Sequence, residues 1–145
     1  MDYIHLTSPC GRDCFNCPFY LALNNPRLKQ FVAKRMGLDP EIVECEGCRN
    51  IEGKCKLLMG FNIGEECKIY RCSKEMGITF CYECEEFPCR LLHPLADKAE
   101  KLPHNIKVYN LCRIKKIGIE KWAKEEAKQS FERYFKGKLE SCVAE

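Results

Sequence analysis

The sequence predicts a small, mostly α-helical, cysteine-rich domain with irregular loops and C-terminal amphipathic helices. The chain has 145 residues, of which 46% are hydrophobic and 31% charged, the balance of a single folded domain. Apolar residues recur at helical spacing along it, and the alternation typical of β-strands is nearly absent. Its 13 cysteines, several times the ordinary share, fall mostly between the predicted helices. We therefore expect loops that are held together by bound metal.

Capping residues mark where the predicted helices begin and end. Asn25 followed by Pro26 begins a helix whose apolar residues recur until Gly37, and Asp39 followed by Pro40 begins a short helix in the same way. A further helix is predicted over residues 65–76, where it carries two cysteines.

Two more helices are predicted over residues 105–117 and 119–136, each followed by a glycine. The second has one apolar stripe, which predicts a side that packs into the core. This stripe consists of Ile119, Trp122, Ala123, Ala127, Phe131, Tyr134 and Phe135.

Composition divides the chain near residue 97. Residues 98–138 contain twelve Lys or Arg against five acidic residues, a net charge of +7, and the rest of the chain has a net charge of −4. We predict a cysteine-rich, metal-binding part (1–97) and a basic helical part (98–145) packed on it as one compact unit. The basic residues alternate with glutamates, so we expect a solvated helix face there; a nucleic-acid surface is possible but not favoured.

The N-terminal sequence favours a cytoplasmic protein. It has an acidic second residue and lacks an apolar run of signal-peptide length, and no window approaches the roughly 18 apolar residues of a membrane span. Thiols stay reduced in the cytoplasm, where closely spaced cysteines more often hold metal than form disulfides.

Eleven cysteines between residues 10 and 89 form short clusters, including three C-x2-C pairs at 14/17, 45/48 and 81/84. Two residues between cysteines let both sulfurs of one turn point at the same metal. We predict two centres, one on the triple 10/14/17 and one on the triple 81/84/89, each completed by a cysteine at 45, 48, 67 or 72. The predicted ligands are Cys10, Cys14, Cys17, Cys45, Cys48, Cys67, Cys72, Cys81, Cys84 and Cys89.

The remaining cysteines and the histidines are not among the predicted ligands. Cys55 has no assigned role, and Cys112 and Cys142 are predicted to be a core thiol and a tail thiol. None of the three histidines stands at ligand spacing from a cysteine, so they are predicted to lie in loops or at helix edges: His5, His93 and His104.

The nature of the metal stays open between two alternatives. Local triples completed by one remote thiolate are typical of iron–sulfur clusters and favour [4Fe–4S] slightly. Two C-x2-C pairs that meet across a fold are typical of zinc sites.

The order of these motifs resembles the domain of unknown function 3795 family, known from anaerobic archaea and bacteria. The resemblance rests on the runs that start at Cys10, Cys45, Cys67 and Cys81, and on the later stretch from Asn110 to Trp122. It implies cysteine-bound metal, whereas the family has no established activity. Some longer relatives continue into a further cysteine knuckle after the Trp segment, and this chain has only Cys142 there.

Two function classes follow from these observations. The first is an iron–sulfur protein with two clusters that acts in electron transfer or redox sensing. The alternative is a zinc-binding structural or interaction module that binds a protein or nucleic acid through its basic helices. Since the chain has no Gly-rich phosphate loop, no Ser-His-Asp order and no H-E-x-x-H motif, enzyme activity is not expected.

Overall fold

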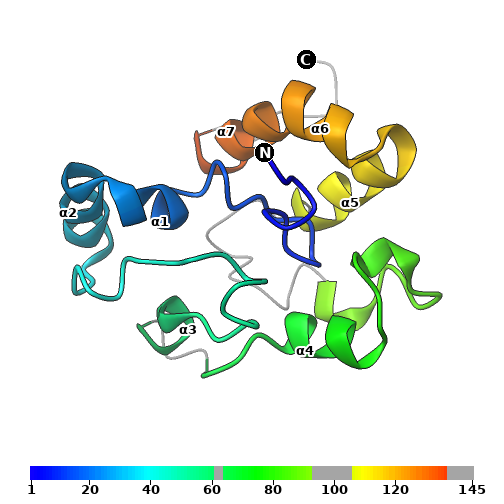
Figure 1. Cartoon of the computed structure of the whole chain (residues 1–145), viewed down its shortest axis with the longest axis horizontal. Coiled ribbons are helices and arrows are strands. Elements are labelled where there is room, and N and C mark those ends of the chain that lie inside the picture. Colours follow the sequence, from blue (N-terminus) through cyan, green and yellow to red (C-terminus); the bar gives the residue numbers. More distant parts are fainter. Residues whose placement is uncertain (61–63, 93–105, 137–145) are drawn as a thin grey trace, which may run out of the picture.

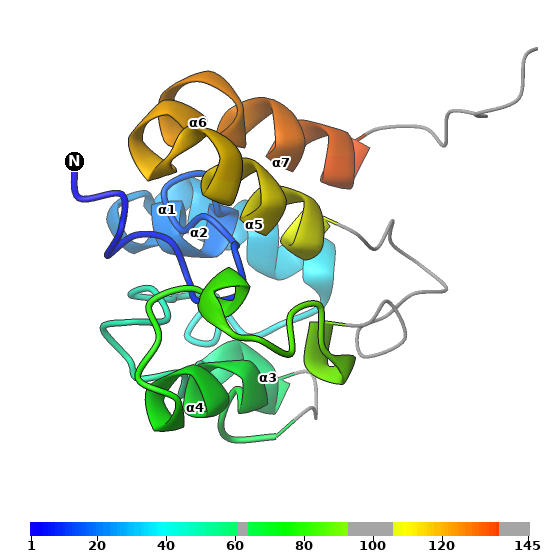
Figure 2. The same cartoon turned by 90° about the vertical axis from the view of Figure 1, so that its right-hand side faces the viewer.

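The computed structural model describes residues 1–60, 64–92 and 106–136, and within these ranges the chain is helical with no β-strand. One isolated antiparallel bridge joins Thr7 to Asp13. The predicted fold class, mostly α-helical and cysteine-rich, is confirmed. In both views, α5, α6 and α7 lie at one end, α3 and α4 lie at the other, and long loops run between them (Figures 1 and 2).

The N-terminal helices are α1 (Pro18–Leu21), the 3-10 turn η1 (Ala22–Asn24) and α2 (Pro26–Met36). The Asn25 side chain accepts a hydrogen bond from the Leu28 amide at 3.0 Å, which caps α2, and Gly37 ends it in the left-handed conformation at φ 65°. The helix predicted between Pro26 and Gly37 is therefore confirmed.

The short helix predicted at Asp39-Pro40 is wrong. The chain makes a single turn there, because the Asp39 carboxylate accepts a hydrogen bond from the Glu41 amide at 2.8 Å and its carbonyl accepts one from the Ile42 amide at 2.9 Å. A local side-chain bond of this kind stabilises a turn without extending it into a helix. The turn delivers Val43, which is fully buried, to the core beneath α2.

The next two helices are α3 (Lys56–Gly60) and α4 (Lys68–Glu75). The prediction placed both nearby cysteines on one helix over 65–76, but α4 begins only at Lys68. Cys67 has extended backbone angles, φ −74° and ψ 112°, and occupies the N-cap position. Cys67 therefore belongs to a loop and Cys72 to a helix.

The short 3-10 turns η2 (Cys81–Glu83) and η3 (Arg90–Leu92) precede the C-terminal helices α5 (Ile106–Ile117), α6 (Ile119–Glu125) and α7 (Ala127–Lys136). The helix predicted over 105–117 is confirmed from Ile106 onward; residue 105 lies outside the described residues. The single helix predicted over 119–136 is in fact two, because Glu126 leaves helical geometry at φ −120° and its carboxylate is held by Arg113 of α5.

The apolar stripe of the predicted last helix faces the core where the structure describes it. Trp122, Ala123 and Ala127 are buried together with Ile114 of α5, and Ile119 and Phe131 are half-buried. The side chains of Tyr134 and Phe135 lie outside the described residues. Lys121 and Lys124 are exposed and form ion pairs within α6 with Glu125 and Glu120, as expected of a solvated face.

Side-chain contacts cross the boundary predicted near residue 97. Leu111 of α5 is fully buried against Cys10 and Phe80, and the Asn110 amide donates a hydrogen bond to the Gly11 carbonyl at 2.9 Å. A side chain at Gly11 would lie 3.0 Å from Leu111, so glycine allows the N-terminal loop to approach α5 closely. In the part of the chain described, no helix has the length and apolar character needed to cross a membrane.

Candidate metal centre

The twelve cysteines among the described residues are all free thiols. Cys112 lies on the exposed face of α5, so the prediction of a core thiol is wrong; the neighbouring Leu111 occupies the buried face instead. Cys142, His93 and His104 lie outside the described residues. His5 is exposed and its Nε2 contacts Asn50 Oδ1 at 2.5 Å, away from the cysteines.

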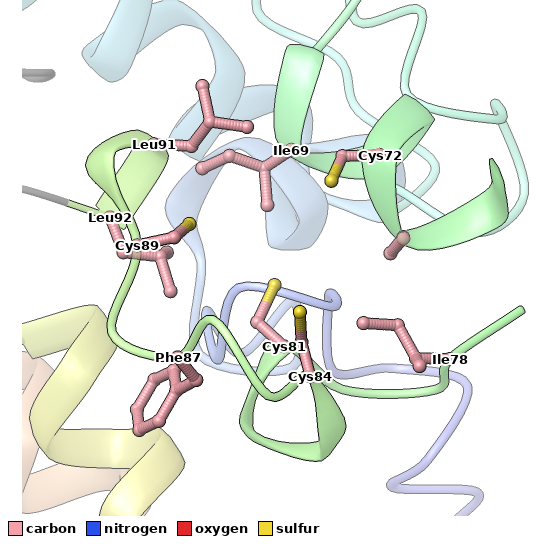
Figure 3. A pocket seen from close by; sticks show the side chains of 10 residues that line it. Ile69, Cys72, Ile78, Cys81, Cys84, Phe87, Cys89, Leu91 and Leu92 are labelled. Carbon is pink, nitrogen blue, oxygen red and sulfur yellow. The ribbon is translucent and has the colours of Figure 1, made fainter. Parts of the chain in front are cut away.

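Four cysteines line one pocket between α4, η2 and η3 (Figure 3). Cys72 lies on α4, and Cys81 is the first residue of η2. Cys84 directly follows η2, and Cys89 directly precedes η3. Their sulfurs face the same space from different elements. This space has a volume of about 30 Å³. The rest of the wall is apolar and consists of Ile69, Ile78, Phe87, Leu91 and Leu92, together with the small side chain of Ser73. We call these four residues the pocket quartet.

The surroundings of Cys81 disfavour its thiolate form unless a cation is present. Burial raises the pKa of the Cys81 thiol to about 12, and the nearby thiols of Cys10, Cys89, Cys72 and Cys84 add to the shift. Several thiolates cannot ionise together in an apolar pocket without a compensating positive charge. A bound metal supplies that charge, so the chemistry of this donor set fits a metal group.

A second group of four cysteines lies in the loops around α1 and α3. Cys45 and Cys55 have their sulfurs 3.7 Å apart. The charge of Cys45 raises the pKa of Cys14, Cys17 and Cys48. The charges of Cys48 and Cys17 act in turn on Cys55. We call Cys14, Cys17, Cys45 and Cys55 the loop quartet.

Each sulfur of the loop quartet faces at least one backbone amide. The amide of Cys48 donates to Cys14, that of Gly47 to Cys45 and that of Leu57 to Cys55. Cys17 accepts from the amides of Phe19 and Tyr20, at the start of α1. Hydrogen bonds to sulfur stabilise thiolates and are the contacts that tune thiolate-bound metals.

Burial opposes these amide contacts in the protein without metal. It raises the pKa of Cys14 to about 12 and is the main cause of the raised pKa of Cys17. The contact between Cys45 and Cys55 raises the pKa of Cys45 and lowers that of Cys55, because ionisation of one thiol disfavours ionisation of its neighbour.

The loops that carry the loop quartet are fixed by backbone geometry and by one arginine. Gly47 has φ 94°, and a side chain there would lie 3.4 Å from Cys14 Sγ. The Arg49 guanidinium donates to the Thr7 carbonyl at 2.9 Å and to the Thr79 carbonyl at 2.7 Å, and it stacks 5.4 Å above the Phe80 ring. Arg49 thus joins three cysteine-bearing loops.

A buried carboxyl group lies between Cys10 and Cys14, and no motif in the sequence indicates it. Asp13 is 4% exposed, and burial raises its pKa to about 6, although the Asn16 amide donates to it at 2.6 Å. Its side chain and its bridge to Thr7 fix the loop. Nothing in the spacing of the motif distinguishes this aspartate from an exposed one.

The structure brings the cysteines of the last triple together with one candidate partner, and it adds one cysteine beside the first group. Cys81, Cys84 and Cys89 come together with Cys72, one of the four cysteines considered as the remote partner. Cys14 and Cys17 lie with Cys45 and with Cys55, which the prediction omitted. The available signal was the C-x2-C-x6-C run at 45, 48 and 55, in which Cys55 belongs to the same local cluster. As the side chains stand in residues 1–60, 64–92 and 106–136, no three His, Cys, Asp or Glu groups converge closely enough to hold a single metal ion.

Comparison with known proteins identifies a family and no function. The family model described as "Protein of unknown function (DUF3795)" matches residues 6–94, which include all eleven clustered cysteines. The segment from Asn110 to Trp122 lies beyond the match. No curated protein and no solved structure matches the chain. The chain therefore belongs to the DUF3795 family of proteins of unknown function.

Proposed function

We propose that this protein binds metal through cysteine thiolates at two four-cysteine centres, that these hold iron–sulfur clusters, and that it acts in electron transfer or redox sensing. The pocket quartet carries this proposal. It combines the local triple Cys81, Cys84 and Cys89 with the remote Cys72, the ligand pattern of a [4Fe–4S] cluster. The loop quartet is the second proposed centre.

The number of sulfurs at the pocket also suits a cube. Four sulfurs surround the pocket, one for each iron of a [4Fe–4S] cluster. Each iron of a cube takes one thiolate, so the four sulfurs surround the cluster and do not meet at a single ion. The apolar wall formed by Ile69, Phe87 and Leu92 would shield such a cluster from water, which is one of the factors that set its potential.

Zinc is the second candidate, and one distance favours it. Cys45 and Cys55 have sulfurs 3.7 Å apart, which agrees with the ligand separation of about 3.8 Å around a tetrahedral zinc ion with Zn–S bonds of about 2.3 Å. A zinc protein of this kind would be a structural or interaction module that presents its basic C-terminal helices to a protein or nucleic acid. We expect no nucleic-acid binding, because Lys121 and Lys124 are already paired with glutamates.

Protein purified without oxygen distinguishes the two candidates. Iron with acid-labile sulfide, a brown colour and a spectral change on adding dithionite are expected. A colourless protein that holds zinc and does not respond to dithionite would replace the proposal with the zinc module.

Substitution of one ligand tests the pocket quartet itself. Cys72→Ser should lower the metal content by one centre, and Cys112→Ser, which changes the exposed thiol of α5, should leave it unchanged. Full metal content in a folded Cys72→Ser protein would exclude Cys72 as a ligand. Circular dichroism of both variants checks that their helices are formed.

A further inference from the structure

We propose that the outer face of helix α2 is a docking surface for an acidic protein, whose carboxylates surround a small apolar depression. The inference goes beyond the proposed function, because no residue of this face is a proposed metal ligand. We call this surface the α2 face. It consists of five exposed residues: Arg27, Gln30, Phe31, Lys34 and Arg35.

Helical periodicity separates the α2 face from the core. Residues at positions i, i+3, i+4, i+7 and i+8 share one side of a helix, and the five residues have this spacing. The opposite side of α2 carries the buried Val32 and Ala33, which pack with Ala22 and Val43. Among the described elements, α2 packs on α1 and η1, and Figure 1 shows it at one edge of the molecule. The core therefore uses one side of α2 and leaves the α2 face to the solvent.

An aromatic ring stands in the middle of the α2 face. Phe31 is 59% exposed, although a phenyl ring gains free energy by burial. Arg27 and Arg35 lie four residues before and after Phe31, and Lys34 lies three residues after it, so three cations surround the ring. An apolar anchor inside a charged rim is the arrangement of residues at a protein–protein interface.

The positive charge of the α2 face is not neutralised within the described chain. Helix α2 contains no Asp or Glu from Pro26 to Met36. In residues 1–60, 64–92 and 106–136, no carboxylate pairs with the three cations of the face. Lys29, which lies off the face, pairs with Glu44 at 2.6 Å. Unpaired cations around an apolar group attract a partner that carries carboxylates around an apolar depression.

The size and composition of the α2 face favour a protein over a nucleic acid or a membrane. Three cations contact few phosphates, and the exposed Asp39 and Glu41 beyond the end of α2 would repel a phosphate backbone that continued past the helix. Helices that bind membranes insert a broad apolar side into the lipid. The apolar side of α2 is already in the core, and Phe31 alone is apolar among the five residues of the face.

The inner side of α2 adjoins the loops of the loop quartet. Cys17 occupies the N-cap position of α1, on which α2 packs. Lys29 of α2 binds Glu44, the residue before Cys45. The α2 face therefore suits a partner that exchanges electrons with the loop quartet. This last step rests on the proposed function, whereas the docking surface itself does not.

Fluorescence anisotropy with a defined acidic peptide tests the α2 face. The probe is a labelled helical peptide in which glutamates surround one leucine, and a matched peptide has serine in place of the leucine. At low salt, the wild-type protein should bind the leucine peptide about tenfold more tightly than the serine peptide, because only the leucine can cover Phe31. Added salt should weaken the binding of both peptides. Absence of binding at low salt, or equal affinity for the two peptides, would overturn the inference.

Charge-neutralised variants locate the binding on the molecule. The double variant Lys34→Gln, Arg35→Gln should bind the leucine peptide about tenfold more weakly than wild type. The matched control is Lys115→Gln, Lys116→Gln, which also removes two exposed charges from the last turn of a helix and should leave the affinity within about twofold. Equal losses in the two double variants would mean a general attraction to positive charge and would contradict the α2 face.

A third variant tests the aromatic anchor. Phe31→Ala should bind both peptides with the affinity of wild type for the serine peptide, so the preference for leucine should disappear. A preference that persists in Phe31→Ala would place the apolar contact elsewhere and refute the proposed surface. Circular dichroism of all variants checks that their helices are formed.

Duplex DNA and phosphatidylserine vesicles are the competing probes. If either binds wild type more tightly than the leucine peptide, and the Lys34→Gln, Arg35→Gln protein loses this binding, the acidic-protein partner is overturned. A wild-type protein that holds no metal but binds the leucine peptide through Phe31 would remove the proposed function and leave this inference intact.

Discussion

Gly53 leaves no room for a side chain at the point where two cysteine loops meet. Gly53→Ala would place a methyl group 2.8 Å from Tyr70 Cβ and strain a backbone at φ 77°. Gly37→Ala is the matched control, because Gly37 has a similar φ of 65° but open space around it. We expect Gly53→Ala to lower the free energy of unfolding by about 2 kcal/mol more than Gly37→Ala in chemical denaturation. Equal losses would show that backbone strain alone matters at both positions.

Arg49 acts as a link between loops rather than as a surface charge. Arg49→Ala leaves the carbonyls of Thr7 and Thr79 without their donor and should cost about 2 kcal/mol or more of unfolding free energy. Arg49→Lys should recover only part of this, because a lysine cannot reproduce the planar fork that reaches both carbonyls. Arg27→Ala, a change of an exposed arginine on α2, serves as the control and should have little effect.

The sequence predicts which cysteines form local clusters, but it predicts only in part which distant cysteines join them. Close spacing identified the local triple Cys81, Cys84 and Cys89, since three residues of one loop remain neighbours in any fold. The position of Cys55 beside Cys45 depends on how the loop folds back before α3, and spacing does not determine that. The same holds for the buried Asp13, whose surroundings come from distant residues.

Among the elements, helix α2 could be predicted because its signals are local: Asn25 caps it and Gly37 ends it. The division between α6 and α7 could not, because it depends on a residue of another helix. Glu126 leaves helical geometry where its carboxylate binds the Arg113 guanidinium of α5, 13 residues earlier. The apolar periodicity within residues 119–136 cannot predict that contact.

The pair of Arg113 and Glu126 should make the packing of α5 against the α6–α7 junction depend on pH. The hydrogen bond from Arg113 lowers the pKa of Glu126 in the folded protein. A lowered folded pKa means that the stabilisation is complete above the unfolded value of about 4.3 and is lost as the pH falls through the folded value. Glu126→Gln should therefore be less stable than wild type at pH 7, with the difference shrinking below about pH 4.3.

The control for this pH dependence is Glu125→Gln. Glu125 is exposed, and its carboxylate lies 4.0 Å from the Lys121 ammonium, so its removal should change stability little at any pH. The free energies of unfolding of wild type, Glu126→Gln and Glu125→Gln are measured by urea denaturation over the same pH range. The three proteins are prepared with equal metal content. A difference between wild type and Glu126→Gln that does not vary with pH would contradict the expectation.

For the whole molecule, the distribution of the cores indicates what metal would contribute. Within the described residues the core consists of three small apolar clusters, two of which share Tyr82 and Ile119 at their edges. Loops without regular structure carry most of the cysteines between them. A domain of this size with so few long helices has little apolar surface to bury. Thiolate-bound metals supply folding free energy in such proteins, because the unfolded chain has no preformed site.

Metal removal should therefore change the environment of Trp122, the single tryptophan of the chain. Trp122 lies in α6, which carries no proposed metal ligand. Its ring is fully buried and meets the edge of Phe15 at a centroid distance of 6.3 Å, and Phe15 stands between Cys14 and Cys17 of the loop quartet. If metal holds that loop, chelation should release Phe15, expose Trp122 to water and shift its fluorescence to longer wavelength, together with a loss of helical circular dichroism. Restoring the metal should reverse both changes. An unshifted Trp122 emission in fully metal-free protein would mean that α5, α6 and the N-terminal loop keep their core without the metal, and that the thiolates stabilise only the loops around α3 and α4.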